Sequence, residues 1–426
     1  MNILVIGNGG REHAIIWKLR QEPEVEKIYC TIGNAGINEI STPVPIKPDN
    51  ISSLLDFAEK NQIGLTVTGP EIPLSLGIVD EFCSKGHKIF GPSQNAAKLE
   101  TSKSFAKGFM KKYGIPSAAF QEYNISQKAE ALKFLESHKY PLVVKADGLA
   151  AGKGVIICRS PEDARNALAE IFDKKVFGAA GDKIIIEDFL AGSEASVFAV
   201  SDGNNYIILP PAQDHKKILE GEKGKNTGGM GSFAPADKIV NDAIMEKVKS
   251  RIIEPVLKNM RDEGNEFKGC LYCGLMINET GDPYVIEFNA RFGDPETQVV
   301  LPLIKSGFFE LLLRSAEGSL DKYRLEIKNE YYCSVVLASK GYPDDYEKGK
   351  VITGLSSVDS GCIVFHAGTG LNENNEIIST GGRVLNVVGC SGKNLREAID
   401  RAYANTGKIN FSNKYFRTDI GLKGLN

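Results

Sequence analysis

The ten residues KADGLAAGKG, at positions 145–154, lie between two apolar runs, 142–144 and Val155–Cys158. A P-loop would need Ser or Thr where Gly154 stands, followed by a helix rather than by an apolar strand. The pattern therefore predicts a β-hairpin whose glycine-rich tip can fold over a triphosphate. Lys145 lies within the first strand, where an ammonium group is costly to bury unless a phosphate or a carboxylate pairs with it. A lysine in a core ion pair is the alternative interpretation.

Toward the N-terminus, short apolar runs alternate with helical segments, beginning with a strand at Asn2–Ile6 and a helix at about 12–21. This alternation predicts a parallel sheet built from βαβ units. The motif GNGGREH, residues 7–13, lies where a phosphate can bind the helix N-terminus. A dinucleotide fingerprint would need glycine in place of Glu12 and an acid at the end of the second strand, 27–32. The sequence therefore disfavours a nicotinamide site, and a tight turn without a ligand is the alternative.

Two segments beyond the hairpin carry polar groups at strand ends. The apolar strand 184–188 leads into a turn that could contact an adenine ring, and Glu194 could reach a ribose. In a later strand, Glu287 and Asn289 share one face because side chains alternate, and two oxygen ligands suit magnesium. Arg291 follows, where a guanidinium could hold a carboxylate or a developing phosphate charge. For each segment, a strand with a solvated face is the alternative.

The remaining segments are less regular. Residues 213–231 contain many Gly, Lys and Glu and almost no apolar residue, which predicts a long mobile loop. A Lys-rich helix is expected over about 93–113. After residue 320, short β runs, a hairpin around 381–382 and a helix at 395–405 predict a small α+β domain.

The composition of the 426-residue chain is that of an ordinary folded protein, with 42% hydrophobic and 25% charged residues. Its net charge of -3 provides no bulk attraction to nucleic acid or to an anionic membrane. We find no apolar run that could span a bilayer, and Met1 leads into a strand rather than a signal peptide, so we expect a cytoplasmic protein. The eight cysteines are scattered, and the lone C-x-x-C pair, Cys270 and Cys273, predicts buried thiols rather than a zinc site.

Four motifs occur in a distinctive order: GNGGREH (7–13), KADGLAAGKGV (145–155), NTGGMG (226–231) and EFNARFGDPETQ (287–298). Together they resemble the phosphoribosylamine–glycine ligases of the ATP-grasp superfamily, over nearly the whole chain. The resemblance implies an α/β and α+β multidomain fold with three domains. These would be an N-terminal Rossmann-like parallel sheet (1–103), an ATP-grasp domain (104–320) with a mobile lid subdomain at about 120–190, and a C-terminal α+β domain (321–426).

The resemblance also implies which residues form the site. For ATP these are Lys103, Lys145, Gly152, Lys153, Gly154, Glu187, Asp188, Phe189, Leu190 and Glu194. For the substrates they are Gly9, Gly10, Arg11, Glu12, Asp214, His215, Lys216, Asn226, Thr227, Gly228, Gly229, Met230, Arg291, Gly293 and Asp294. The implied catalytic residues are Lys145, Arg291 and Asp214. The implied ligands of Mg²⁺ or Mn²⁺ are Glu287 and Asn289. Many relatives carry a second metal carboxylate on the preceding strand, where this chain has Cys273, Gly274 and Leu275.

The activity that the resemblance implies is an ATP-dependent ligation in purine biosynthesis. Glycine would be activated as an acyl phosphate and then captured by the amine of phosphoribosylamine. The partners would be these small molecules, with neither nucleic acid nor membrane, and the protein would be a monomer. Another ATP-grasp ligase or carboxylase is the first alternative, which the pattern at 213–231 disfavours. A nicotinamide oxidoreductase and a nucleotide-binding regulatory protein are the others, and Lys145, Glu287 and Arg291 argue against the latter.

Overall fold

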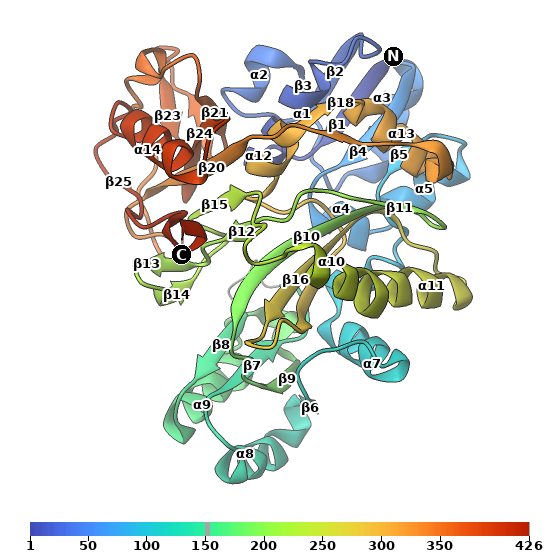
Figure 1. Cartoon of the computed structure of the whole chain (residues 1–426), viewed down its shortest axis with the longest axis vertical. Coiled ribbons are helices and arrows are strands. Elements are labelled where there is room, and N and C mark those ends of the chain that lie inside the picture. Colours follow the sequence, from blue (N-terminus) through green and yellow to red (C-terminus); the bar gives the residue numbers. More distant parts are fainter. Residues whose placement is uncertain (150–153, 426) are drawn as a thin grey trace.

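The computed structural model describes residues 1–149 and 154–425. Its N-terminal part is a five-stranded parallel sheet of order β3-β2-β1-β4-β5 (Figure 1), which confirms the predicted βαβ pattern. The strands are β1 (Asn2–Ile6), β2 (Lys27–Thr31), β3 (Thr42–Val44), β4 (Ile63–Thr68) and β5 (Ile89–Phe90). The helices of this part are α1 (Gly10–Leu19), α2 (Ile37–Ile40), α3 (Ile51–Lys60), α4 (Glu71–Ser75) and α5 (Ile78–Ser84).

The prediction of a single helix over about 93–113 is wrong, because the structure has two helices there, α6 (Lys98–Thr101) and α7 (Lys103–Tyr113). Ser102 between them is extended, and its hydroxyl accepts a hydrogen bond from Phe105 N at 3.1 Å, which is an N-cap. Asp147 at the end of the lid strand β7 accepts a hydrogen bond from Ser104 N at 2.6 Å. The interruption at Ser102 therefore lets α7 start beside the predicted phosphate-binding hairpin, and these two hydrogen bonds hold its first turn there.

The lid is a separate lobe at the bottom of Figure 1, with its own apolar core. It is a four-stranded antiparallel sheet of order β6-β9-β7-β8. Its elements are β6 (Phe120–Asn124), α8 (Lys128–Ser137), β7 (Leu142–Ala146), β8 (Val155–Cys158), α9 (Pro161–Leu168) and β9 (Lys183–Asp188). Strands β7 and β8 pair as the predicted hairpin, with Lys145 opposite Val155.

A second antiparallel sheet, of order β11-β10-β16-β17, lies between the lid and the upper lobes in Figure 1. Its strands are β10 (Ser193–Asp202), β11 (Tyr206–Ile208), β16 (Lys268–Ile277) and β17 (Pro283–Asn289). The helices that follow or precede these strands are α10 (Asp242–Val248), α11 (Glu254–Asp262), α12 (Thr297–Val300) and α13 (Phe308–Glu317). Strand β16 is almost fully buried and carries Cys270 and Cys273, which are free thiols. Among the described helices, none has the length and apolar character needed to cross a bilayer.

The C-terminal part is built on a six-stranded sheet, and two of its strands come from residues 213–234. The main path runs β12-β15-β20-β24-β21, and β25 pairs with β20. The bounds are β12 (Gln213–Asp214), β15 (Gly231–Ala234), β20 (Tyr331–Ser339), β21 (Ile363–His366), β24 (Arg383–Ser391), α14 (Leu395–Thr406) and β25 (Lys414–Tyr415). The hairpin expected around 381–382 is wrong, because β23 (Ile377–Ser379) pairs with β22 (Thr369–Leu371) instead. Strand β24 then pairs with β20 and β21.

Residues 213–231, expected to be a long mobile loop, contain strands and contact the C-terminal part, whereas their mobility remains a prediction. Strands β13 (Lys217–Leu219) and β14 (Lys223–Asn226) form a hairpin. The fully buried guanidinium of Arg417 donates to Glu222 at 2.8 Å, to Lys217 O at 2.8 Å and to both carboxylate oxygens of Asp419 at 2.7 Å. The expectation of a loop without structure is therefore wrong, because distant partners supply the contacts that the local sequence lacks.

A buried pair of histidines joins the N-terminal and C-terminal parts, which lie side by side in Figure 1. His366 N, at the end of β21, donates to His13 Nδ1 of α1 at 2.8 Å, and the ring centroids are 5.7 Å apart. Burial lowers the pKa of His13 to about 3 and that of His366 to about 4, so both rings are neutral. Asn34 Nδ2 donates to His366 O at 2.9 Å and strengthens the junction.

Candidate active site

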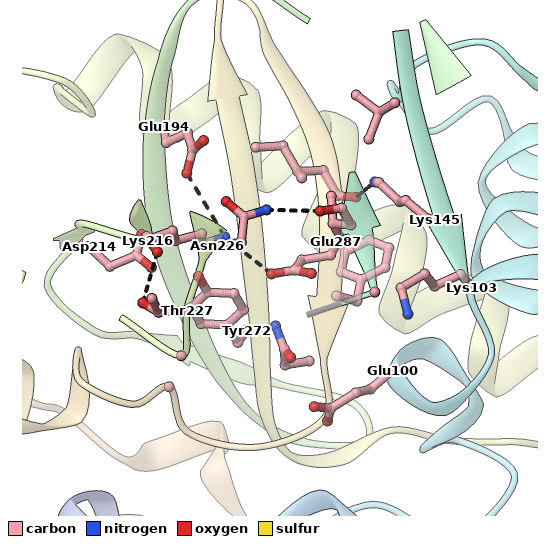
Figure 2. Close-up of a pocket in the computed structure, with 18 of the residues that line it drawn as sticks. Glu100, Lys103, Lys145, Glu194, Asp214, Lys216, Asn226, Thr227, Tyr272 and Glu287 are labelled. Atoms are coloured by element: carbon pink, nitrogen blue, oxygen red, sulfur yellow. Dashed lines mark hydrogen bonds and ion pairs between the residues drawn. The ribbon is translucent and has the colours of Figure 1, made fainter. Parts of the chain in front are cut away.

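A cavity of about 550 Å³ lies between the lid sheet and the β10–β17 sheet, and all parts of the chain contribute to its lining. Most of the predicted site residues line it: Arg11, Lys103, Lys145, Gly154, Glu187, Asp188, Phe189, Leu190, Glu194, Asp214, Lys216, Asn226, Thr227, Gly228, Glu287, Asn289, Arg291, Gly293 and Asp294. Figure 2 shows Lys103 and Lys145 on one side, Asp214 and Lys216 on the other, and Glu287 between them. The predictions for Gly152 and Lys153 lie outside the described residues.

The lysine side of the cavity is anchored by a buried carboxylate. Glu187, near the end of β9, accepts from Lys145 Nζ at 2.9 Å and from Lys107 Nζ at 3.2 Å. Lys145 Nζ also donates to Ile286 O on β17 at 3.0 Å. The ion pair with Glu187 agrees with the alternative interpretation of Lys145, and its place in the cavity lining leaves phosphate binding as a prediction.

Lys103 stands at the first position of α7, beside the lid hairpin. Its Nζ donates to Gly148 O at 3.1 Å. Burial lowers its pKa, and the nearby carboxylate of Glu287 opposes that shift. A cation held by neutral carbonyls in this way can exchange them for phosphate oxygens at small cost.

The predicted metal ligands lie on β17, as their spacing required. Glu287 Oε1 is 3.2 Å from Lys216 Nζ, and Asn289 Oδ1 accepts from Arg291 at 3.1 Å. Opposite Glu287 on β16 is Gly274, where a Cβ would come 3.1 Å from Glu287 Cγ, so no second carboxylate fits there without a shift. Among the described residues no group of three or more His, Cys, Asp or Glu is arranged to hold a metal. One carboxylate and one amide oxygen fit an ion that takes its other ligands from a nucleotide.

Arg291 is held by two acids that sequence reasoning missed. Its guanidinium is 2.8 Å from Glu100 on α6 and 3.2 Å from Glu71 on α4. Glu100 also accepts from Ala290 N at 2.7 Å. Burial raises the pKa of Glu100 against the opposing effect of Arg291. The orientation of Arg291 is thus set by the N-terminal part of the chain.

Asp214 on β12 lies on the side of the cavity opposite Lys103 and Lys145, close to several other acids. Burial raises its pKa well above the ordinary value, Lys216 opposes this, and Glu296, Glu194 and Glu287 reinforce it. A carboxyl group whose pKa is raised by burial is a stronger base than an ordinary carboxylate, which suits it to proton transfer.

The GNGG turn does not line the cavity, although Arg11 beside it does. Glu12 accepts hydrogen bonds from Gly9 N and from Arg11 Nε, both at 2.6 Å. Both of these partners of the carboxylate thus lie within the 7–13 motif. A Cβ on Gly10 would lie 2.7 Å from Asn386 Nδ2 and 2.8 Å from Gln298 Nε2. The glycine therefore permits close approach of the C-terminal part to α1.

His215, Gly229 and Met230 lie behind the cavity wall. His215 is buried, and its Nε2 accepts from Gly421 N at 3.3 Å. Burial lowers the pKa of His215 to about 3, so it is neutral. Met230 is fully buried in the C-terminal core, and a Cβ on Gly229 would lie 2.4 Å from Pro295 Cδ. In this arrangement the three residues shape the turn that presents Thr227 and Gly228 to the cavity.

Comparison with known proteins identifies the family. Models of phosphoribosylglycinamide synthetase match the chain in three consecutive segments: its N domain at residues 1–100, its ATP-grasp (A) domain at 101–297 and its C domain at 332–423. The chain belongs to the phosphoribosylglycinamide synthetase family.

Individual members of this family are similar over their whole length. Phosphoribosylamine–glycine ligase of Chlorobaculum tepidum is 47% identical, with 100% of both chains covered. The crystal structure of phosphoribosylamine–glycine ligase from Thermotoga maritima has a TM-score of 0.84 at 34% identity, covering 98% of this chain and 100% of that one. Biotin carboxylase from Campylobacter jejuni, at 17% identity and a TM-score of 0.73, covering 100% of this chain and 95% of that one, shares the fold.

Several cavity residues of this synthetase family member were not predicted from the sequence. They are Glu71, Glu100, Lys107, Tyr272, Glu296, Tyr342 and Arg383. Arg383 on β24 reaches in from the C-terminal part and is 3.0 Å from Asp294 Oδ2. For Lys107 a signal existed, because it follows Lys103 by four residues and so shares its helix face. For Arg383 the only sequence signal was its position after two glycines, and this signal is too weak to identify a site residue.

Proposed function

We propose that this chain catalyses the ATP-dependent ligation of glycine to phosphoribosylamine, giving glycinamide ribonucleotide, ADP and phosphate in purine (IMP) biosynthesis. The reaction is the one named in its relatives, which match it from end to end. The observation that carries the proposal is a single cavity lined both by Lys103 and Lys145, suited to phosphates, and by Asp214, Lys216 and Arg291, suited to small polar substrates.

In the first step, a carboxylate oxygen of glycine attacks the γ-phosphorus of ATP and the bond to the β–γ bridging oxygen breaks, giving glycyl phosphate and ADP. We assign Lys103 and Lys145 to the phosphates and the turn Glu187–Leu190 and Glu194 to the nucleoside. Arg291 would orient the glycine carboxylate. Catalysis here consists of positioning and charge neutralisation, since phosphoryl transfer needs no covalent participation by the protein.

In the second step, the amine of phosphoribosylamine attacks the acyl carbon, and phosphate leaves as the amide forms. The amine loses a proton, for which Asp214 is the proposed acceptor, because burial raises the pKa of this carboxyl group well above its ordinary value and so makes it a stronger base. Arg11, Asp294 and the Asn226–Gly228 turn would hold the sugar phosphate. Closure of the lid would keep water from the acyl phosphate.

Mg²⁺ or Mn²⁺ would fit this donor set, with Glu287 and Asn289 as the protein ligands beside the nucleotide. When bound, the ion would neutralise charge on the transferred phosphoryl group. We further propose a cytoplasmic, monomeric protein with domains at 1–103, 104–320 and 321–426. The cavity, which is lined by charged side chains, and the near-neutral net charge support small-molecule partners alone.

ADP release in the presence of ATP, glycine and freshly made phosphoribosylamine tests the proposal, with each component omitted in turn. ADP formation should need both substrates, and alanine should replace glycine poorly. Robust turnover with bicarbonate or D-alanine in place of glycine would instead assign the chain to another ATP-grasp activity.

A further inference from the structure

One oxygen of Glu187 is shared by two lysines. Lys145 Nζ is 2.9 Å and Lys107 Nζ is 3.2 Å from Glu187 Oε2. All three side chains are buried, with exposures of 3–4%. The other oxygen, Oε1, is buried and has no hydrogen-bond partner within the described part of the chain. These two ammonium groups are thus the charged partners on which the carboxylate depends.

The two lysines differ in what else they contact. Lys145 also donates to Ile286 O at 3.0 Å, on the strand that carries Glu287, so it bridges Glu187 and the centre of the cavity. Lys107 lies on α7, one turn beyond Lys103. Its Nζ is 3.5 Å from Ala118 O and 5.8 Å from the centre of the Phe120 ring. Both lysines line the cavity, but Lys145 also bonds to the strand that carries Glu287, whereas the additional contacts of Lys107 lie on the Ala118–Phe120 side.

ATP binding would change the ion pairing of Glu187. Under the proposed function, Lys145 bonds to the triphosphate, and its ion pair with Glu187 is then weakened. A buried carboxylate that loses its only counter-ion is strongly destabilised. Lys107 prevents this, because it remains on the same oxygen. Burial lowers the pKa of Lys107 to about 8 against the opposing effect of Glu187, so at neutral pH Lys107 still carries its charge.

We propose that Lys107 is a positioning residue, which keeps the Glu187 carboxylate paired while Lys145 turns to the phosphates of ATP. The inference rests on the proposed function only in assigning the phosphates to Lys145. It predicts that the loss of Lys107 weakens the binding of phosphate-bearing ligands and leaves the binding of the bare nucleoside nearly unchanged. A lysine that merely supports the pocket wall would affect both equally.

The first experiment measures the binding of a non-hydrolysable ATP analogue by calorimetry and of adenosine by competition, in Lys107→Met and in the unaltered protein. We expect the analogue to bind about tenfold or more weakly in the variant, and adenosine to change by less than about threefold. Lys111→Met is the matched control. Lys111 lies one turn further along α7, and its Nζ is 6.0 Å from the same Phe120 ring, but it is exposed. Equal losses for analogue and adenosine would overturn the proposal.

A double-mutant cycle tests the mechanism. If Lys107 acts through Glu187, then Lys107→Met should cost less than about threefold in a Glu187→Gln background, since no carboxylate remains to be paired. Lys107→Arg, which keeps the charge, should recover part of the analogue binding. In steady-state kinetics the KM for ATP should rise while that for glycine stays within about twofold. A full penalty in the Glu187→Gln background would refute the mechanism.

The binding measurements also separate this inference from the proposed function. If the protein failed to turn over glycine and phosphoribosylamine, the proposed function would fall, yet the difference between analogue and adenosine would still decide the role of Lys107. Unchanged binding of the analogue in Lys107→Met, in a protein that does turn over these substrates, would remove the inference alone.

Discussion

The ammonium group of Lys216 lies 3.2 Å from Glu287 Oε1 and 3.9 Å from Glu194 Oε2. This lysine is the main cause of the low pKa of Glu287, about 2, so the carboxylate proposed to hold the metal is ionised at every working pH. It is also already paired (Figure 2). A divalent ion that arrives with ATP must therefore share or displace Lys216, which would free a cation for the substrate half of the cavity.

Glu287→Gln should lower kcat by about two orders of magnitude, with a smaller change in ATP affinity. Charge builds on the transferred phosphoryl oxygens in the transition state, so a missing carboxylate is felt there more than in the ground state. Asn289→Asp should partly restore the activity of this variant, because it returns a charge to the same strand face. Steady-state kinetics with titrated magnesium checks both. An unchanged kcat and magnesium dependence would move the metal elsewhere, with Asp214 and Asp294 as the next candidates.

Lys145→Met should reduce turnover by at least about a hundredfold and leave the fold intact. The reason is that Lys145 connects the Glu187 carboxylate to the strand that carries Glu287, at the place where the phosphates are expected. Circular dichroism and thermal unfolding report on the fold, and ADP release reports on turnover. Near-normal activity would mean that the ion pair with Glu187 is the whole role of this lysine.

Arg417→Ala should loosen the β13–β14 hairpin, although Arg417 itself does not line the cavity. The hairpin carries Asn226 and is held to the C-terminal part through Glu222, which bonds to Arg417. Amides of residues 217–226 should exchange hydrogen about tenfold faster or more, because the opening of this segment no longer breaks the ion pair between Glu222 and the buried Arg417 guanidinium. Arg314→Ala, which removes an i,i+4 pair with Glu310, is the control. Equal exchange in both variants would show that strand pairing alone orders the hairpin.

Stability should fall as the pH is lowered from 6.5 to 5. The folded-state pKa values of His13, His215 and His366 are about 3, 3 and 4, below the ordinary value of 6.5. In this window the unfolded chain takes up protons at these imidazoles and the folded chain does not, so acid favours unfolding, by up to about 1.4 kcal/mol per pH unit for each ring. Urea denaturation across this range measures the slope. His13→Gln, which keeps an acceptor for His366 N, should flatten it, and an unchanged slope would contradict the assignment.

Local pattern was sufficient for the parts of the site that lie on single elements. The glycine-rich pattern predicted the pairing of β7 with β8, and the alternation in β17 placed Glu287 and Asn289 on one face. The partners of these residues could not be predicted, since Glu100 and Arg383 reach the cavity from remote segments with no periodic signal. Residues 213–231 were misjudged for the same reason. Their strands are polar, and they owe their order to β20 and Arg417, which lie far along the chain.

The cavity lining runs from Arg11 to Arg383, and this has a consequence for biosynthesis. The lysines proposed to bind the nucleotide, and β17, are synthesised before the wall containing Arg383 and before β20, the strand that pairs with β15. If a nascent chain folded after releasing only the first two family segments, its proposed phosphate-binding groups would therefore face an open groove. Any acyl phosphate formed there would be exposed to water and hydrolysed. Under the proposed function, synthesis of the last segment would thus complete the enclosure that couples ATP cleavage to amide formation.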